Sequence, residues 1–247
     1  MSNRWFPYYR PRPQARLRLF CFHYAGGSAS VFRLWSEMIP AQIDLCALQL
    51  PGRENRLTET LITHCPQLVE MLVPVILPYL DIPYAFFGHS MGAIVSFELA
   101  RTLNRSRYTP PAHLFVSGRR GPRVERREPF TYDLPDSTFI EKLRQLEGTP
   151  EEVLQNKELL ELLLPTIRAD FTLSETYAYQ DQALLTCPIS AYGGLQDKEV
   201  TREDMAAWHL ETRGQFIQRV FPGNHFFLHS AREQLLEVIT RELLAAL

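Results

Sequence analysis

Short apolar runs alternate along the chain with longer stretches in which apolar residues recur every three or four positions. The apolar runs have the length of buried strands and predict them at residues 17–22, 43–48, 84–87, 113–117, 187–192 and 216–221. The periodic stretches predict helices at residues 31–39, 65–80 and 93–101, and a last helix from about 230 to 247. Strands that alternate with helices are typical of an α/β fold in which helices flank a mostly parallel sheet.

The stretch from about residue 134 to 179 differs, because its helical periodicity contains no convincing strand. Here we expect Asp136 to cap one helix and Pro150 to occupy the first position of a second. Pro165 is expected to interrupt a third helix, since proline has no N–H to donate. We therefore predict that residues 1–247 form one α/β domain with a helical insertion at about 134–179. With 45% of its residues hydrophobic, the chain can fill a substantial core.

Ser90 stands between two glycines, Gly88 and Gly92, at the point where the apolar run 84–87 ends and helical periodicity begins. Glycines at these positions remove the Cβ atoms that would collide in a sharp turn from a strand into a helix. Such a turn, called a nucleophile elbow, exposes the serine hydroxyl. The alternative is a glycine-rich connection that carries a solvated serine, but the flanking strand and helix favour the elbow.

A serine hydroxyl is a poor nucleophile at neutral pH, so a catalytic serine needs a base and a third group that orients the base. Chains with this elbow place the acid and then the histidine after the serine. Asp197 follows the predicted strand 187–192, and His225 follows the predicted strand 216–221. Because both lie where parallel strands end, we predict Ser90 as the nucleophile, His225 as the base and Asp197 as the orienting acid.

Other acids and histidines fit these roles less well. Asp170 falls within the helical insertion, and Asp204 falls at the start of a helix. None of the remaining histidines combines a preceding strand, a turn and a position after the acid: His23, His64, His89, His113, His209 and His229. The structural alternative is that Asp197 is an ordinary turn residue and His225 an ordinary structural histidine.

Acyl transfer also requires hydrogen-bond donors for the oxyanion that develops on the attacked carbonyl. This kind of fold supplies one donor from the residue after the nucleophile and one from the loop after an early strand. We predict that the backbone N–H groups of Met91 and Ala25 form this oxyanion hole. The loop 24–28 could instead bind phosphate through its glycines, although it contains no G-K-[ST] sequence.

Composition restricts the partners and the surroundings of the protein. With 26 Lys and Arg residues against 28 Asp and Glu residues, the net charge is −2, which gives no reason to expect nucleic acid as a partner.

The 4 cysteines lack C-x-x-C spacing and are expected to be buried free thiols, as in a reducing cytoplasm. No apolar stretch has the length of a membrane span, and residues 1–7 lack the apolar core of a secretion signal. We expect a soluble cytoplasmic protein whose arm at residues 4–18 packs on the edge of the domain.

Several longer segments form a recognisable set of motifs. They are HYAGGSASVFRLW (23–35), LQLPGRENRL (48–57), GHSMGAIVSFELA (88–100), VSGRRGP (116–122), LPDSTFIEKLRQLEGTPEEVL (134–154), LLLPTIRADFTLSETYAY (162–179), GGLQDKEV (193–200) and FPGNHFFL (221–228). With these motifs the chain resembles the type II thioesterases of the α/β-hydrolase superfamily. These are the stand-alone editing hydrolases that accompany polyketide and nonribosomal peptide synthetases. The segments of the helical insertion are far more specific to that family than the elbow.

The resemblance implies the catalytic and oxyanion residues predicted above, and a mobile lid at about 134–179 over an acyl channel. The implied substrate is an acyl group linked as a thioester to the phosphopantetheine arm of an acyl or peptidyl carrier protein. The implied reaction removes stalled or aberrant acyl groups through an acyl-enzyme and needs no metal or redox cofactor. We expect a monomer whose partners are carrier protein domains. Two positions depart from the family pattern: Asn224 replaces a frequent glycine, and His23 replaces a common proline.

Alternative functions stay open at this point. The catalytic residues do not dictate whether an oxygen ester or a thioester is cleaved, so a carboxylesterase or an acyltransferase on the same fold is the alternative. A third possibility is an inert binding module with a hydrolase-like fold, against which the intact set of catalytic residue types argues.

Two groups of side chains have both a functional and a structural interpretation. Apolar residues of the insertion could line the acyl channel or could form ordinary core: Leu159, Leu160, Leu163, Leu164 and Phe171. The arginine-rich segment Arg119–Arg127 could steer an acidic carrier protein, since charge complementarity mainly raises association rates, or it could be a solvated basic loop.

Overall fold

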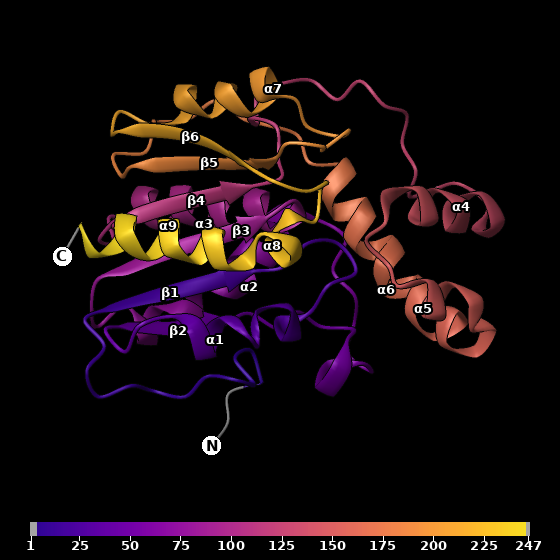
Figure 1. Ribbon diagram of the computed structural model, residues 1–247, viewed down its shortest axis with the longest axis horizontal. Coiled ribbons are helices and arrows are strands. Elements are labelled where there is room, and N and C mark those ends of the chain that lie inside the picture. The colour runs from indigo at the N-terminus through magenta and orange to yellow at the C-terminus, as the bar shows by residue number, and fades with distance from the viewer. Residues whose placement is uncertain (1–3, 246–247) are drawn as a thin grey trace.

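The computed structural model describes residues 4–245. Its centre is a six-stranded sheet in the order β2-β1-β3-β4-β5-β6, in which every neighbouring pair is parallel (Figure 1). The strands are β1 (Leu17–Phe22), β2 (Ile43–Ala47), β3 (Tyr84–His89), β4 (His113–Ser117), β5 (Ile189–Gly194) and β6 (Phe216–Phe221). The predicted α/β fold with a parallel sheet is confirmed.

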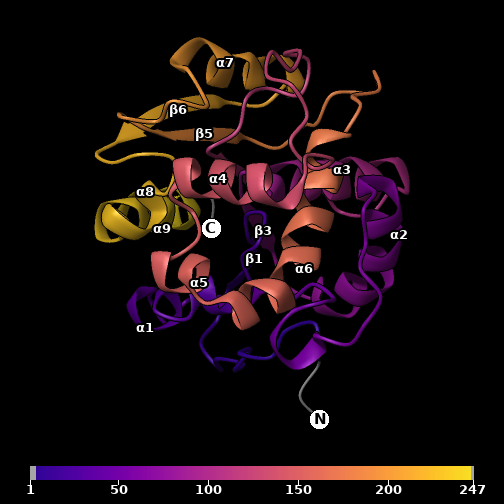
Figure 2. The ribbon, with the colours of Figure 1, turned by 90° about the vertical axis from the view of Figure 1, so that its right-hand side faces the viewer.

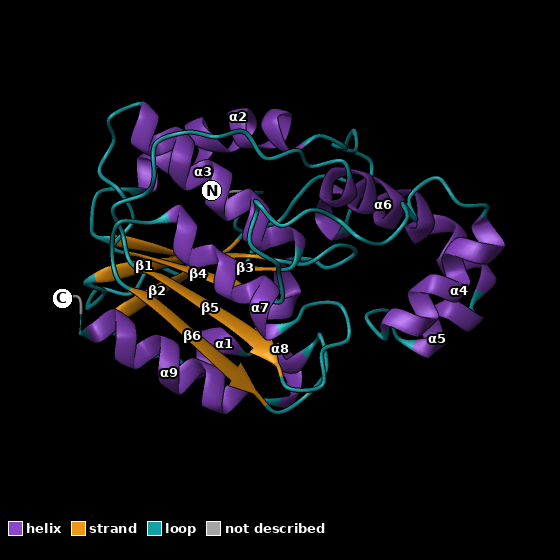
Figure 3. Cartoon of the chain, turned by 90° about the horizontal axis from the view of Figure 1, so that it is seen from above, coloured by secondary structure: helices purple, strands orange, loops and turns teal. Residues whose placement is uncertain are grey.

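Helices cover both faces of the sheet. They are α1 (Trp35–Met38), α2 (Cys65–Ile76), α3 (Met91–Arg105), α4 (Asp136–Leu146), α5 (Glu151–Gln155), α6 (Lys157–Glu175), α7 (Arg202–Ala206), α8 (Phe227–Ser230) and α9 (Arg232–Leu244). Figure 3 shows α2 and α3 on one side of the sheet and α1 and α9 on the other. Along β1, Phe20 and Phe22 belong to the apolar cluster that includes α2 and α3, whereas Leu19 and Cys21 belong to the cluster that includes α1, α8 and α9. Because both faces are covered, the central strands β3 and β4 are buried along their whole length, which is why short apolar runs predicted them. The edge strand β6 contains Gln218 and Arg219 and is only partly buried.

The predicted strand limits agree with the structure at β1, β4 and β6. The strand β2 ends one residue early, and β3 continues to His89, directly before the elbow. The strand β5 starts after Pro188, which has no N–H for the ladder, and extends to Gly194, which pairs with Phe221. Gly193 and Gly194 therefore belong to the sheet and not to the loop that follows it.

Several helix predictions need correction. The predicted helix 31–39 is a 3₁₀ turn at Ala29–Phe32 followed by the short α1. The predicted helix 65–80 ends as α2 at Ile76 and continues as a 3₁₀ turn around Pro78, because that proline cannot donate to the preceding turn.

The last predicted helix also differs from the structure. It is divided at Ala231 into α8 and α9. Its predicted end at Leu247 lies outside the described residues. The predicted helix 93–101 is part of the longer α3.

The insertion contains helices, as predicted, but their ends differ. Asp136 is the first residue of α4 and not its cap, and Pro150 is the N-cap of α5 and not its first residue. Pro165 lies within α6, which runs without interruption from Lys157 to Glu175. A proline removes one helical hydrogen bond, and here tertiary contacts hold the next residues: the Thr166 hydroxyl donates to the Gly52 carbonyl at 2.6 Å.

The described part of the N-terminal arm packs against the domain, as predicted. Trp5 and Phe6 are buried, and the Trp5 carbonyl accepts a hydrogen bond from the N–H of Gln49 at 2.8 Å. The Tyr9 hydroxyl donates to the Asp44 carboxylate at 3.0 Å, at the start of β2. The arm is therefore held by both apolar and polar contacts.

The four cysteines are free and buried, which confirms the expectation from their spacing: Cys21, Cys46, Cys65 and Cys187. Within residues 4–245, no helix combines the length and the apolar character that a membrane span requires. The insertion helices α4, α5 and α6 lie beyond the carboxyl ends of the strands, where the loops after β3, β5 and β6 also lie (Figures 1 and 2). This end of the sheet is where sites form in open α/β sheets.

The packing of α2 predicts different effects at two adjacent positions. Leu72 is fully buried in the core, whereas Met71 is 38% exposed. Leu72→Ala should lower the free energy of unfolding by about 2–5 kcal/mol, because it removes buried methyl groups and leaves a cavity. Met71→Ala should change it by about 0.5 kcal/mol or less. Urea denaturation measures both, and equal losses would contradict this assignment of the buried face.

Candidate active site

Ser90 lies in a sharp turn between β3 and α3, with φ 54° and ψ −110°, a backbone conformation that few residues other than glycine adopt. A Cβ on Gly88 would lie 2.1 Å from the carbonyl oxygen of Gly92. One on Gly92 would lie 2.2 Å from the carbonyl oxygen of Phe22 in β1. The N–H of Ser90 donates to the carbonyl of Ser117 in β4 at 2.7 Å. The turn therefore depends on close packing of α3 against β1, β3 and β4.

His225 and Asp197 form a hydrogen-bonded pair at the ends of neighbouring strands. The Nδ1 atom of His225 donates to Oδ2 of Asp197 at 2.8 Å, and the Asp197 side chain is completely buried. The other carboxylate oxygen, Oδ1, accepts from the backbone N–H of Glu199 at 2.8 Å and of Val200 at 3.3 Å. These contacts orient the carboxylate, which fixes the proton on Nδ1 and leaves Nε2 of His225 as the basic nitrogen.

The loops that carry these two residues are joined to each other. The Gly223 N–H donates to the side-chain oxygen of Gln196 at 2.6 Å, and the Gln196 N–H donates to the Gly223 carbonyl at 2.9 Å. A Cβ on Gly194 would lie 2.2 Å from the carbonyl oxygen of Asn224, so the two loops touch through their backbones. The distance between the two side chains is therefore set by backbone contacts.

A cavity of about 540 Å³ lies between this end of the sheet and the helices α4 and α6. Ser90, His225 and Ala25 all line it, and Asp197 is bonded to the ring nitrogen of His225. Apolar side chains form much of the remaining wall: Ile94, Phe97, Val124, Leu134, Leu146, Phe171, Trp208 and Phe226. The structure thus brings the predicted nucleophile and base to one largely apolar chamber.

The predicted oxyanion donors lie on the elbow and on the loop after β1. Met91 is the first residue of α3, so its N–H has no acceptor within the helix. Ala25 belongs to residues 24–27, which we call the glycine loop. Its fold is supported by His23, whose Nδ1 donates to the Tyr24 carbonyl at 2.8 Å. Burial, with a smaller effect of Arg53, lowers the pKa of His23 to about 4, so this imidazole is neutral near pH 7.

The alternative acids and histidines have other contacts. Asp170 pairs with Arg53 at 2.7 Å, and Asp204 pairs with Arg127 at 2.7 Å. His89 is buried 5.2 Å from the His225 ring, measured between centroids, and its Nδ1 contacts the Ser117 hydroxyl at 2.8 Å. Burial holds the pKa of His89 well below its ordinary value, so His89 is a neutral neighbour.

The predicted channel lining is correct for one residue. Phe171 lines the cavity. The other apolar candidates do not: Leu160, Leu163 and Leu164 pack with Phe139, Leu143 and Ile167 inside the insertion, and Leu159 is 36% exposed. These leucines bury one another because the insertion must fill a small core of its own. The helical period alone does not distinguish that core from the cavity wall.

Sequence reasoning missed several cavity residues. Trp208 and Phe97 pack edge to face with their centroids 5.1 Å apart, and the Trp208 indole N–H donates to the Arg119 carbonyl at 2.9 Å. Arg119 also lines the cavity, and its guanidinium donates to the Ser174 hydroxyl at 3.0 Å. Burial lowers the pKa of Arg119 to about 10. No local pattern around these residues indicates that they meet.

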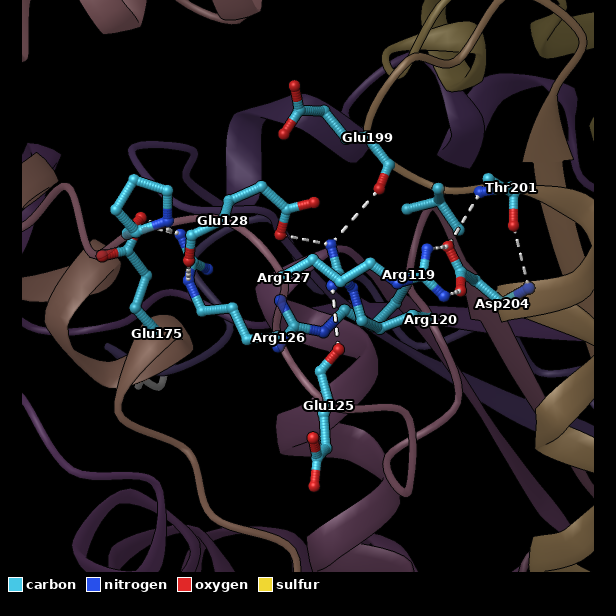
Figure 4. Close-up of polar contacts among 12 residues, drawn as sticks. Arg119, Arg120, Glu125, Arg126, Arg127, Glu128, Glu175, Glu199, Thr201 and Asp204 are labelled. Carbon is cyan, nitrogen blue, oxygen red and sulfur yellow. Dashed lines mark hydrogen bonds and ion pairs between the residues drawn. The ribbon is translucent and has the colours of Figure 1, made fainter.

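Carboxylates compensate most of the charges of the segment Arg119–Arg127 (Figure 4), and Arg123, Arg126 and Arg127 are also exposed to solvent. The ion pairs are Arg120 with Glu128 at 2.8 Å, Arg123 with Glu211 at 2.8 Å, Arg126 with Glu175 at 3.0 Å and Arg127 with Asp204 at 2.7 Å. Glu211, Glu175 and Asp204 are themselves buried. The segment builds one wall of the cavity, and the proposal that it steers an acidic partner loses much of its basis.

Known proteins are similar to this chain over nearly its whole length. The thioesterase domain family matches residues 17–243. The gramicidin S biosynthesis protein GrsT of Aneurinibacillus migulanus is 45% identical over 241 residues, which are 98% of this chain and 94% of that protein. Thioesterase PikA5 of Streptomyces venezuelae is 37% identical over 244 residues, covering 98% of this chain and 86% of that protein.

Solved structures lead to the same family. The type II thioesterase BorB from the borrelidin biosynthetic cluster superimposes with a TM-score of 0.87 and 36% sequence identity over 95% of each chain. The family match spans all six strands, and GrsT is 45% identical to this chain. The fold shared with BorB points to the same family as the motifs in the sequence. The chain belongs to the thioesterase domain family.

Proposed function

We propose that this thioesterase hydrolyses acyl groups carried as thioesters on the phosphopantetheine arm of acyl or peptidyl carrier proteins. It would thereby free stalled or aberrant acyl groups from a polyketide or nonribosomal peptide synthetase. The observation that carries the proposal is that Ser90 and the Asp197-bonded His225 line one apolar cavity in a chain of the thioesterase family. The printed descriptions of GrsT and BorB, which name biosynthetic pathways, support this setting.

The proposed acylation step uses groups of this chain only. The Nε2 atom of His225 takes the proton of the Ser90 hydroxyl as Oγ attacks the thioester carbonyl. The negative charge that develops on the carbonyl oxygen is stabilised by the N–H groups of Met91 and Ala25. Collapse of this intermediate breaks the carbon–sulfur bond, and His225 returns the proton to the departing pantetheine thiol. Asp197, held by two backbone donors, stabilises the imidazolium while it exists.

Deacylation repeats this chemistry with water. His225 removes a proton from a water molecule that attacks the Ser90 ester, and the proton passes to Ser90 Oγ as the free acid leaves. Because the neighbouring His89 is neutral, it adds no positive charge beside the imidazolium. The apolar wall around Phe97 and Trp208 fits an acyl chain and limits the number of waters near the ester. The steps require no metal or redox cofactor.

We further propose that the protein acts as a cytoplasmic monomer. Its buried free thiols suit a reducing compartment. Helices cover both faces of the sheet, and the described N-terminal arm packs beside β2.

Hydrolysis should depend on Ser90 and should favour the carrier-bound substrate. Ser90→Ala removes the attacking oxygen and should lower release of free acid from acetyl-, propionyl- and longer acyl-carrier proteins by at least about 10³-fold. Ser106→Ala, at the exposed end of the same helix, is the matched control and should keep the wild-type rate. Matching pantetheine thioesters and oxygen esters are measured in parallel. Turnover of oxygen esters alone would favour a carboxylesterase, and transfer to an added acceptor would favour an acyltransferase.

Of two apolar residues of α6, only one should affect chain-length preference. Phe171 lines the cavity, so Phe171→Ala should raise the ratio of kcat/KM for octanoyl over propionyl pantetheine thioester by at least about tenfold. Leu160 packs inside the insertion, so Leu160→Ala should lower the free energy of unfolding by about 2–5 kcal/mol and leave that ratio unchanged. An equal change of the ratio in both variants would contradict the assignment of Phe171 to the acyl channel.

A further inference from the structure

We propose that the buried ion pair of Arg53 and Asp170 positions the glycine loop, and with it the oxyanion donor Ala25, against the reacting carbonyl. The inference rests on the proposed hydrolysis and adds two positioning residues to it. Arg53 lies in the loop after β2, and Asp170 lies on α6 of the insertion. Neither residue takes part in the proton transfers proposed for Ser90 and His225.

Both residues of the ion pair bind the backbone of the glycine loop. The Arg53 guanidinium binds the Asp170 carboxylate in a bidentate manner: Nη1 donates to Oδ2 at 2.7 Å and Nη2 donates to Oδ1 at 2.8 Å. Asp170 Oδ2 also accepts the N–H of Gly26 at 2.8 Å, and Arg53 Nη1 donates to the carbonyl of Gly27 at 3.0 Å. The N–H of Gly26 and the carbonyl of Gly27 are therefore bound by the two partners of one ion pair.

Besides the ion pair, the glycine loop is held at Tyr24, whose carbonyl accepts hydrogen bonds from the Gly27 N–H at 3.0 Å and from Nδ1 of His23 at 2.8 Å. Gly26 has φ +78°, and neither it nor Gly27 has a side chain that could pack into the core. An ideal Cβ on Gly26 would lie 3.3 Å from the Ile167 side chain, so α6 approaches the loop closely. A donor to an oxyanion must sit about 2.7–3.1 Å from the charge that develops. A loop of small residues needs external contacts to keep a donor at that distance.

The burial of the pair explains why it acts on geometry more than on stability. The side chains of Arg53 and Asp170 are 7% and 2% exposed, so both charges have lost their water. Such pairs gain little net stability, and their retention requires that every polar atom has a partner. Here the backbone provides those partners, since Arg53 Nε also donates to the Pro51 carbonyl at 3.2 Å. His23, the neighbouring titratable group, is neutral and adds no third charge.

The pair also joins α6 to the catalytic end of the sheet. Beside it, the Thr166 hydroxyl donates to the Gly52 carbonyl, so two successive turns of α6 bind the loop that contains Arg53. The segment from Thr166 to Asp170 cannot leave the site without exposing the ion pair and releasing the glycine loop. Closure of the acyl cavity and placement of the oxyanion donor therefore depend on the same contact.

The test compares Asp170→Asn with the wild type on acetyl pantetheine thioester. The amide keeps the shape of the carboxylate but removes its charge and replaces one accepting oxygen by an NH₂ group that faces the guanidinium. The ion pair that holds Gly26 is thereby weakened, so kcat should fall about 10–100-fold with KM changed less than about threefold. The affinity for a trifluoromethyl ketone analogue, which forms an oxyanion on Ser90, should fall by the same factor as kcat/KM. Asp44→Asn is the matched control, because Asp44 is a buried ion-paired carboxylate at the opposite end of the sheet. It should leave kcat unchanged.

A double variant separates positioning from stability. Arg53→Met with Asp170→Leu replaces the ion pair by apolar side chains, which is often neutral for folding. The urea midpoint should return toward the wild-type value while kcat stays low, because the hydrogen bonds to the Gly26 N–H and the Gly27 carbonyl are then lost. Recovery of kcat together with the midpoint, or an unchanged kcat in Asp170→Asn, would overturn the proposal. Full hydrolysis by Ser90→Ala would instead refute the proposed function, whereas Ser90-dependent hydrolysis with an unchanged kcat in Asp170→Asn would refute only the role of the ion pair.

Discussion

The structure depends first on the strained turn at Ser90. A serine with φ 54° and ψ −110° costs of order 1–3 kcal/mol, and surrounding contacts must hold it there. These contacts come from the hydrogen bond to Ser117 and from the glycine contacts that bring α3 against β1 and β3. The buried apolar face of α3 supplies the packing that keeps the turn closed. The fold therefore stabilises a conformation that a serine would not adopt alone.

The parallel sheet places Asp197 and His225 near the turn at Ser90. Parallel register places the ends of β3, β5 and β6 at one edge, so Ser90, Asp197 and His225 reach the same region although long segments separate them in sequence. Backbone contacts between Gly194 and Asn224 then bring the loops of the acid and the base together. The arrangement leaves a single apolar chamber above the serine, closed on its far side by the insertion.

The insertion is both a cover and a part of the framework. The second half of α6 is bound at several points: Thr166 to Gly52, Asp170 to Arg53, Ser174 to Arg119, and Glu175 to the N–H of Thr131 at 2.7 Å. These contacts bind the part of α6 that follows Pro165 to the loops after β2 and β4. In the arginine-rich segment, three guanidinium groups neutralise acids that folding has buried: Arg123 pairs with Glu211, Arg126 with Glu175 and Arg127 with Asp204.

The sequence by itself determined the strands, the elbow and the order of Ser90, Asp197 and His225, because periodicity and glycine placement depend on neighbours along the chain. It also indicated the insertion, but it misjudged Pro165, whose helix is held by contacts from outside it. Only the tertiary structure decided which side chains face the cavity and which charges are paired. Arg126 meets Glu175 across 49 residues, and Arg53 meets Asp170 across 117. A buried charge needs whatever partner the folded chain brings within a few ångströms, and local sequence does not encode that distance.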